Sequence, residues 1–122
     1  MSFTTPELIL EELPPGVVIV TPAGLAVGGA IPVPPAVQGR WITIGAGPDQ
    51  DIVIRDQPPG VSRSHCRLIL RGAFLIQGRL HPDGYAINGV RYHDCTARPL
   101  RDGDRVTIGK YVTVRFRLLL PD

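Results

Sequence analysis

The sequence predicts an all-β protein, a sandwich of two sheets built from many short strands. The 122 residues include 14 Gly and 13 Pro, a composition that suits short strands joined by turns better than long helices. Apolar and polar residues alternate over runs of about four to eight residues, which is the period of a strand with one buried face. The length is enough for one domain with its own hydrophobic core.

The first fifteen residues differ from the rest. In this stretch Thr5 can act as an N-cap and Pro6 as the first helical residue, giving one or two turns that end before Pro14. An extended arm fits the same residues. We therefore expect residues 1–15 to be an acidic arm or a short helix outside the main domain.

From residue 16 onward, apolar runs are bounded regularly by Gly, Pro or Asp, as expected for strands. Residues 71 and 72 separate two of these runs as a tight turn, and Asn88-Gly89 is the strongest short hairpin signal known. We expect about ten to eleven short strands, mostly antiparallel. The runs are 17–21, 30–33, 40–45, 51–54, 65–70, 73–78, 85–92, 105–109 and 111–120.

Charge is distributed unevenly along the chain. Residues 1–39 contain no Lys or Arg, whereas every one of the 13 basic residues lies from Arg40 onward. Arginine predominates among them, and its planar fork suits bidentate contacts to phosphate or carboxylate. The plainer interpretation is that these side chains solvate the outer faces of strands. No basic run carries stacking aromatics, so we expect no nucleic-acid binding.

The two cysteines, Cys66 and Cys95, form no CxxC pair. Cys66 shares its strand face with apolar residues, which predicts a buried structural thiol. His93, Asp94 and Cys95 do not make a closed zinc site, so we expect neither a metal nor a cofactor. The chain shows no apolar signal segment and no stretch long enough to span a bilayer, which predicts a cytoplasmic protein without direct membrane contact.

Several motifs occur in a characteristic order: Gly45 at the end of the third predicted strand, "DIVI", "VSRSH", an Asn-Gly hairpin, and "LRDGDRVTIG" before the last strand. This ordered set resembles the forkhead-associated (FHA) domain, a β-sandwich that binds phosphothreonine peptides through loops at one end. The resemblance covers residues 16–120, so we expect residues 16–122 to form an FHA domain.

The resemblance implies a phosphate site that is only partly present. In the family, the Gly that ends the third strand is followed by an Arg that contacts the phosphate, but Gly45 is followed by Ala46. The Ser of the family's Ser-Arg-x-His motif supplies a hydroxyl to the phosphate, and Ser62 keeps it, with Arg63 beside it. The family's His ties loops together, so His65 is expected to be structural.

The family's third loop carries Thr-Asn-Gly. If Asn88-Gly89 corresponds to the family's later hairpin, with a structural role, then Pro82, Asp83 and Gly84 stand opposite Thr-Asn-Gly. Asp83 would then repel a phosphate and cannot donate a hydrogen bond when ionised. The loss at Ala46 alone weakens phosphopeptide binding roughly tenfold to a hundredfold.

The resemblance therefore implies a non-enzymatic protein-interaction module whose phosphate reading is weakened or lost. One alternative is a competent phosphothreonine reader in kinase signalling, in which Arg63 or Arg79 replaces the missing arginine. Another is a structural domain in a larger assembly such as a secretion ring. An enzyme is not expected, because no nucleophile elbow, metal-ligand set or phosphate-binding Gly loop is present. The acidic arm is either a free tail or docked on the Arg-rich body.

Overall fold

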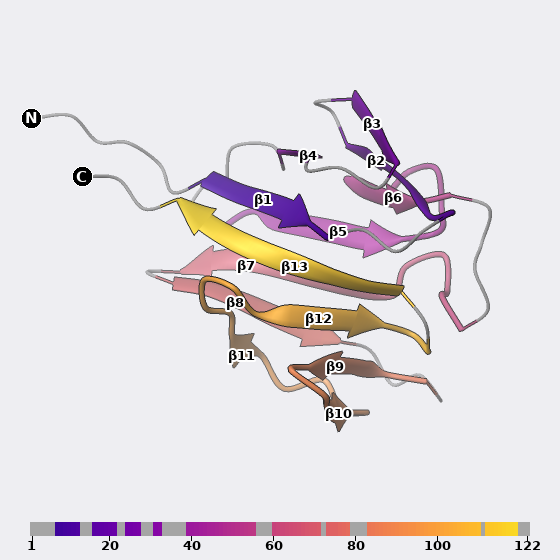
Figure 1. Cartoon of the computed structure of the whole chain (residues 1–122). Coiled ribbons are helices and arrows are strands. Elements are labelled where there is room, and N and C mark those ends of the chain that lie inside the picture. Colours follow the sequence, from indigo (N-terminus) through magenta and orange to yellow (C-terminus); the bar gives the residue numbers. More distant parts are fainter. Residues whose placement is uncertain are drawn as a thin grey trace, which may run out of the picture.

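The computed structural model describes residues 7–12, 16–21, 24–27, 31–32, 39–55, 60–71, 73–78, 83–110 and 112–119. Within these residues all regular structure is β, and the strands form two sheets (Figure 1). The predicted all-β sandwich is confirmed. This part of the chain holds no helix that is long and apolar enough to cross a membrane.

The first sheet has six strands, and every pair of neighbours in it is antiparallel. Its centre is the antiparallel pair formed by the two last strands of the chain, which correspond to the predicted runs 105–109 and 111–120. In spatial order the strands are β10 (Val90–Tyr92), β9 (Tyr85–Ile87), β12 (Arg105–Ile108), β13 (Val112–Leu119), β1 (Glu7–Glu11) and β4 (Ile31–Pro32).

The second sheet has seven strands, and its neighbours are antiparallel except β5 and β6, which run parallel. Antiparallel pairs therefore dominate, as predicted. In spatial order the strands are β11 (Arg98–Pro99), β8 (Ala73–Gly78), β7 (Cys66–Arg71), β5 (Trp41–Gly45), β6 (Ile52–Ile54), β2 (Val18–Thr21) and β3 (Gly24–Val27).

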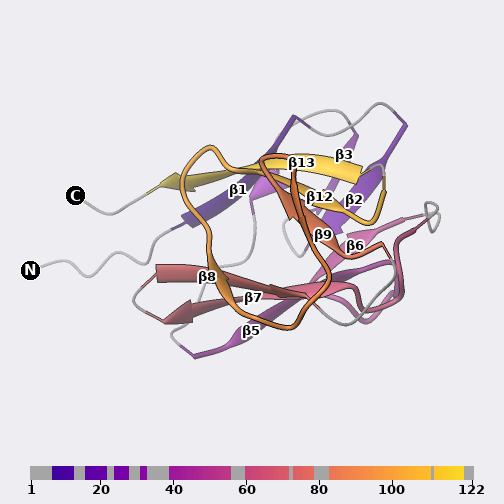
Figure 2. The same ribbon diagram turned by 90° about the horizontal axis from the view of Figure 1, so that it is seen from below.

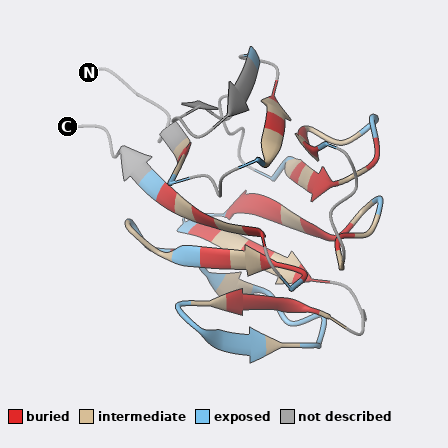
Figure 3. Cartoon of the chain, turned by 45° about the vertical axis from the view of Figure 1, so that its right-hand side comes forward, coloured by how far each residue is buried: buried red, intermediate tan, exposed pale blue. Residues whose placement is uncertain are grey.

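The two sheets lie as two layers, with β5, β7 and β8 in one and β1, β12 and β13 in the other (Figure 2). The alternation of the sequence puts the apolar side chains between them. In β13, Val112, Val114 and Phe116 are buried, whereas Arg117 is exposed. Figure 3 shows burial concentrated along the central strands and exposure along the β10 edge. Cys66 is buried in this core, as predicted.

The arm or helix expected at residues 1–15 is not what the described part of that segment forms. Glu7–Glu11 is strand β1, which pairs with β13 along its whole length and with β4 at Leu10. Leu10 is only 1% exposed and belongs to the core. A helix this short is marginal in water, so pairing with two strands outweighs its local preference.

The acidic end of β1 also contacts arginines of the main domain. This is the docked arrangement, one of the two alternatives that the sequence left open for the acidic arm. Glu12 pairs with Arg105 at 3.1 Å and with Arg115 at 3.4 Å, and Glu11 pairs with Arg117 at 3.5 Å. All three arginines belong to β12 and β13, the strands that follow β1 across the sheet. The charge asymmetry of the sequence thus becomes a row of ion pairs.

The Asn88-Gly89 hairpin is confirmed. Ile87 pairs directly with Val90, which leaves a two-residue loop, and both loop residues have positive φ, 49° and 86°. This is the backbone of a type I′ turn, whose twist matches that of the flanking strands. The described strands number six and seven in the two sheets, more than the ten or eleven expected, because β1, β3 and β11 were not predicted.

Candidate functional site

Loops from three parts of the chain meet at one end of the sandwich. The loop after β5 pairs with the segment before β7: the Ala46 N–H donates to the Ser62 carbonyl at 3.0 Å, and the Gly47 N–H to the Arg63 carbonyl at 2.9 Å. The main-chain N–H of His65 donates to the Ile44 carbonyl at 2.9 Å, which continues this series of hydrogen bonds into β5 and β7. The sequence-predicted residues 45, 46, 62 and 63 are therefore brought together.

His65 joins these loops to the start of β9. Its Nδ1 accepts the Ser62 N–H at 3.1 Å, and its Nε2 lies 2.6 Å from the Gly84 carbonyl oxygen. Because a carbonyl only accepts, Nε2 carries the proton and the ring is neutral. The side chain is 2% exposed. His65 thus fixes the distance between two loops that are far apart in the sequence.

Two glycines allow these close approaches. A Cβ at Gly45 would lie 2.2 Å from the Arg63 carbonyl oxygen, so any side chain there would push the two loops apart. Gly84 has a φ of 58°, and a Cβ on it would lie 2.1 Å from the carbonyl oxygen of Tyr92. A residue with a side chain at position 84 would therefore shift the main chain there, and with it the Gly84 carbonyl that accepts the hydrogen bond from His65.

The Ser62 hydroxyl is half-buried at this junction. It donates to the Ser64 carbonyl at 3.1 Å and lies 3.4 Å from His65 Nδ1. A hydroxyl can rotate, so the same proton can turn to an anion that approaches from outside. His65 does not serve as a base for it, because Nδ1 already holds the backbone N–H of Ser62.

A pocket of about 350 Å³ opens beside Ser62 and is lined by Ala46, Gly47, Pro48 and Arg63. The side chain of Ala46 packs against the hydrophobic core. Arg63 is exposed, and its guanidinium makes no hydrogen bond or ion pair with the described residues. Among the lining residues that the structure describes, the one cationic group is therefore that of Arg63, and residue 46 contributes none.

Asp83 lies at the edge of the same group of loops. Its carboxylate stands 3.7 Å from the Lys110 ammonium, and a Cβ added to Gly60 would lie 2.9 Å from one of its oxygens. Arg91 donates to the main-chain carbonyl of Asp83 and, at 2.7 Å, to that of Gly109. Lys110 offsets part of the negative charge that the sequence suggested would face a phosphate.

Of the remaining predicted site residues, only some fall in the described part of the chain. Arg79 and Pro82 fall outside the described residues. Asn88 and Gly89 are at the opposite end of β9 from Gly84, where the Asn88 amide donates to Asp104 at 2.9 Å and accepts the Arg105 N–H at 2.9 Å. They hold the β9–β10 hairpin to β12 and do not contribute to the pocket.

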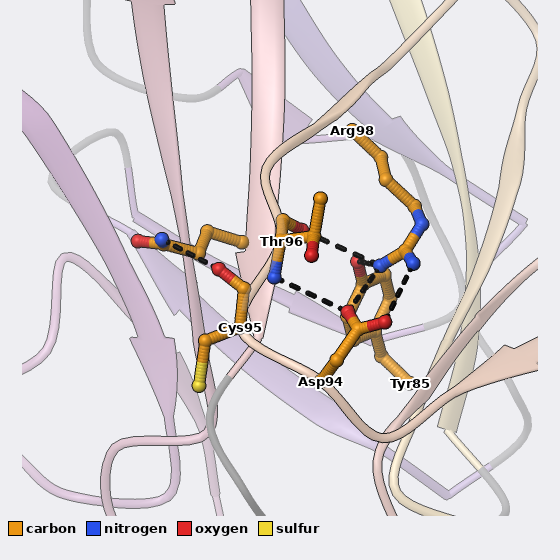
Figure 4. A network of polar contacts seen from close by, with 6 residues as sticks. Tyr85, Asp94, Cys95, Thr96 and Arg98 are labelled. Atoms are coloured by element: carbon orange, nitrogen blue, oxygen red, sulfur yellow. Dashed lines mark hydrogen bonds and ion pairs between the residues drawn. The ribbon is translucent and has the colours of Figure 1, made fainter.

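A polar network fixes the segment that follows β10 beside the site (Figure 4). Arg98 forms two hydrogen bonds to the Asp94 carboxylate, at 2.6 and 2.7 Å, and a third to the Tyr85 hydroxyl at 3.0 Å. These bonds to Arg98 lower the pKa of Asp94 to about 2. Arg98 also stacks on Tyr92, 3.7 Å from the ring centroid. The network keeps this segment against Tyr85, one residue after Gly84.

Sequence reasoning missed Lys110 and the role of Gly60. Both meet Asp83 only because the chain folds, and neither carries a local signal of its function. The sequence "TIGK" placed Gly109 correctly at the end of a strand, which was the one available sign that Lys110 begins a loop. Among the described residues, no group of three His, Cys, Asp or Glu side chains is arranged to hold a metal ion.

Comparison with known proteins agrees with this geometry. The sequence profile of the FHA domain matches residues 42–109. The FHA domain of a hypothetical protein from Arabidopsis thaliana superposes with a TM-score of 0.68 at 24% identity, covering 100% of this chain and 97% of the other. No curated protein sequence matches the chain.

Two further solved structures share the fold. An FHA domain from a structural and functional analysis of phosphothreonine-dependent interactions gives a TM-score of 0.65 at 21% identity, with 95% and 99% of the two chains covered. The FhaA FHA domain, complexed with the intracellular domain of Rv3910, gives 0.60 at 20% identity, with 93% and 100% covered.

Proposed function

Because the chain belongs to the FHA domain family, we propose that it is a non-enzymatic protein-interaction module that binds its partner through the loops around Ser62 with little help from phosphate. The observation that carries this proposal is Ala46. It occupies the position where the family's motif places an arginine. Its methyl group packs against the core and gives the pocket wall an apolar group in place of a guanidinium.

The missing guanidinium sets the size of the effect. A hydrogen bond to a charged group contributes roughly 1.5 to 3 kcal/mol, so its loss weakens phosphopeptide binding about tenfold to a hundredfold. Ser62 and Arg63 still line the junction and the pocket. Phosphate therefore retains some favourable contacts, but they are too few to dominate the binding free energy.

Asp83 supports the same conclusion. An ionised carboxylate accepts hydrogen bonds but donates none, so Asp83 does not replace an amide that holds the backbone carbonyls of a peptide. Lys110, 3.7 Å away, reduces its repulsion of an anion without supplying the lost donor. The loops thus favour a partner that offers N–H groups to Asp83.

A second candidate is a competent phosphothreonine reader, favoured by the exposed Arg63 guanidinium on the pocket wall. The Arg63 guanidinium forms no ion pair with a carboxylate of the described chain, and the planar arrangement of its N–H donors suits a phosphate. Among similar folds, one was studied for phosphothreonine-dependent interactions, which supports this candidate.

Catalysis at Ser62 is disfavoured by its surroundings. Both nitrogens of His65 are engaged with main-chain groups, so the ring is not available to take the hydroxyl proton. We propose that the Ser62 hydroxyl acts only as a hydrogen-bonding group.

The proposal is tested by an amide-shift titration of the labelled protein with a degenerate phosphothreonine peptide library and its unphosphorylated twin. We expect phosphate-specific shifts around residues 45–50 and 60–65 to saturate only near millimolar peptide. Ser62→Ala should abolish them, whereas the matched Ser64→Ala should retain them. Saturation at micromolar peptide would instead establish the competent reader, and Arg63→Gln would then raise the dissociation constant at least about tenfold.

A further inference from the structure

The outer face of the second sheet carries a cluster that the loop site does not use. Trp41, Ile69 and Leu75 are cross-strand partners on β5, β7 and β8, and Arg67 and Arg71 flank Ile69 on β7. We call these five residues the Trp41 face. One side of the β5–β7–β8 layer is turned away from the other sheet (Figure 2).

The alternation of β7 shows which way these residues point. Cys66, Leu68 and Leu70 enter the core between the sheets, so Arg67, Ile69 and Arg71 project outward. Ile69 is nevertheless only 1% exposed, since its neighbours across the sheet are large. Trp41 itself is half-buried. Trp41, Ile69 and Leu75 therefore form a row of apolar side chains that pack against one another across the three strands.

The two arginines are held in place by aromatic stacking. The Arg67 guanidinium lies 3.8 Å from the centroid of the Trp41 ring, and that of Arg71 lies 5.9 Å from it. Arg67 also donates from Nε to the Gln77 side chain at 2.9 Å. Ordering both side chains in advance lowers the entropy lost when they bind a ligand.

The described residues of the face carry an excess of positive charge. The strands β5, β7 and β8 contain no Asp or Glu, and neither Arg67 nor Arg71 forms an ion pair with the described residues. Arg40, directly before β5, is also exposed. The nearby acid Asp51 is engaged by the N–H of Thr43 at 2.9 Å. By contrast, the arginines of β12 and β13 are paired with Glu11 and Glu12.

We propose that the Trp41 face is a second docking surface, which binds an acidic segment of a partner protein. Tryptophan and arginine are the residues that most often dominate protein interfaces, and a planar guanidinium matches a carboxylate with two hydrogen bonds. A nucleic acid fits less well, because Arg67 covers the Trp41 ring on which a base would stack. Trp41 begins β5 and Gly45 ends it, so the surface lies away from the loop site.

Trp41 is the only tryptophan in the chain, so its fluorescence reports on this surface directly. The probe is decaglutamate, with decalysine and a ten-nucleotide single-stranded DNA as comparators. We expect decaglutamate to change the Trp41 emission saturably and decalysine to leave it unchanged. Absence of a saturable change with decaglutamate, or tighter binding of the DNA, would overturn the proposal.

Matched variants separate this surface from general charge. Arg71→Gln and Arg101→Gln each remove one exposed arginine that has no ion pair in the described chain. Arg71 belongs to the Trp41 face, whereas Arg101 lines a separate pocket together with Asn88 and Asp104. Arg71→Gln should raise the dissociation constant of decaglutamate about fivefold, and Arg101→Gln should leave it unchanged. Equal weakening by both would contradict the proposal. Phosphopeptide shifts at residues 60–65 should be the same in Arg71→Gln, so this test is independent of the loop site.

Discussion

At the scale of single residues, His65 decides how the loop site is assembled. Its ring accepts the main-chain N–H of Ser62 and donates to the main-chain carbonyl of Gly84, which lies nineteen positions after His65. A neutral histidine is one of the few side chains that can do both at once. The sequence predicted this structural role from the family's motif, but not its partners, since Gly84 is distant along the chain.

Replacing His65 by Ala should destabilise the fold by roughly 2 to 4 kcal/mol, because two buried main-chain groups lose their partners and a cavity remains. The free energy of unfolding in urea measures this loss. His93→Ala, which removes an exposed histidine, is the control and should cost less than about 1 kcal/mol. Equal losses in both variants would refute the bridging role.

The buried thiol of Cys66 should produce a distinct pH dependence. Burial raises the pKa of Cys66 from 9.0 to about 12. The stabilisation by the protonated thiol is therefore fully present below pH 9 and is lost as the pH rises towards 12, at up to about 1.4 kcal/mol per pH unit.

Cys66→Val removes this dependence and keeps an apolar side chain in the core. The free energy of unfolding of the protein should fall more steeply than that of the variant between pH 9 and 11. If the free energy of unfolding changed with pH in the same way in both proteins, the Cys66 thiol would not contribute to the pH dependence of stability. Cys95 is exposed and remains in both proteins, so it serves as the internal control.

The proximity of the loop residues was predictable from the sequence, whereas their surroundings were not. Gly45, Ala46, Ser62 and Arg63 were placed together by a motif, and the structure brings them into one pocket and its edge. The compensation of Asp83 by Lys110 was not predictable, because it depends on the relative position of two strands that are far apart in the chain.

At the scale of elements, β1 shows how tertiary pairing overrides local preference. Five residues that read as an arm or a helix become an inner strand between β13 and β4. The longer strands from β5 onward were predicted because alternation and turn residues agree there. β3 and β11 were missed because the first is rich in small residues and the second is two residues long.

Leu10 should contribute more to the stability of β1 than its ion pairs do. Leu10→Ala removes a side chain from the core and should cost roughly 2 to 4 kcal/mol. Glu12→Gln breaks exposed pairs to Arg105 and Arg115 and should cost less than about 1 kcal/mol. Thermal unfolding distinguishes the two, and a larger loss for Glu12→Gln would mean that β1 is held mainly by charge.

At the scale of the whole molecule, the sandwich separates its functions. The core between the sheets carries stability, one end presents the loop site, and the outer face of one sheet carries unpaired arginines. On the other sheet, the acidic N-terminal segment and the basic C-terminal segment neutralise each other, because Glu11 and Glu12 form ion pairs with arginines of β12 and β13. Among the arginines without an ion pair in the described chain, Arg63 lies at the loop end, and Arg67 and Arg71 lie on the Trp41 face.

The most direct test of the central claim is to restore the missing guanidinium with Ala46→Arg and to measure the dissociation constants of the phosphothreonine library and its unphosphorylated twin. For the unmodified chain we predict that the two constants differ by less than about tenfold. In Ala46→Arg the phosphorylated library should bind roughly tenfold to a hundredfold more tightly, with the twin unchanged. A chain that already prefers the phosphorylated library by a hundredfold, and gains nothing from Ala46→Arg, would contradict the account.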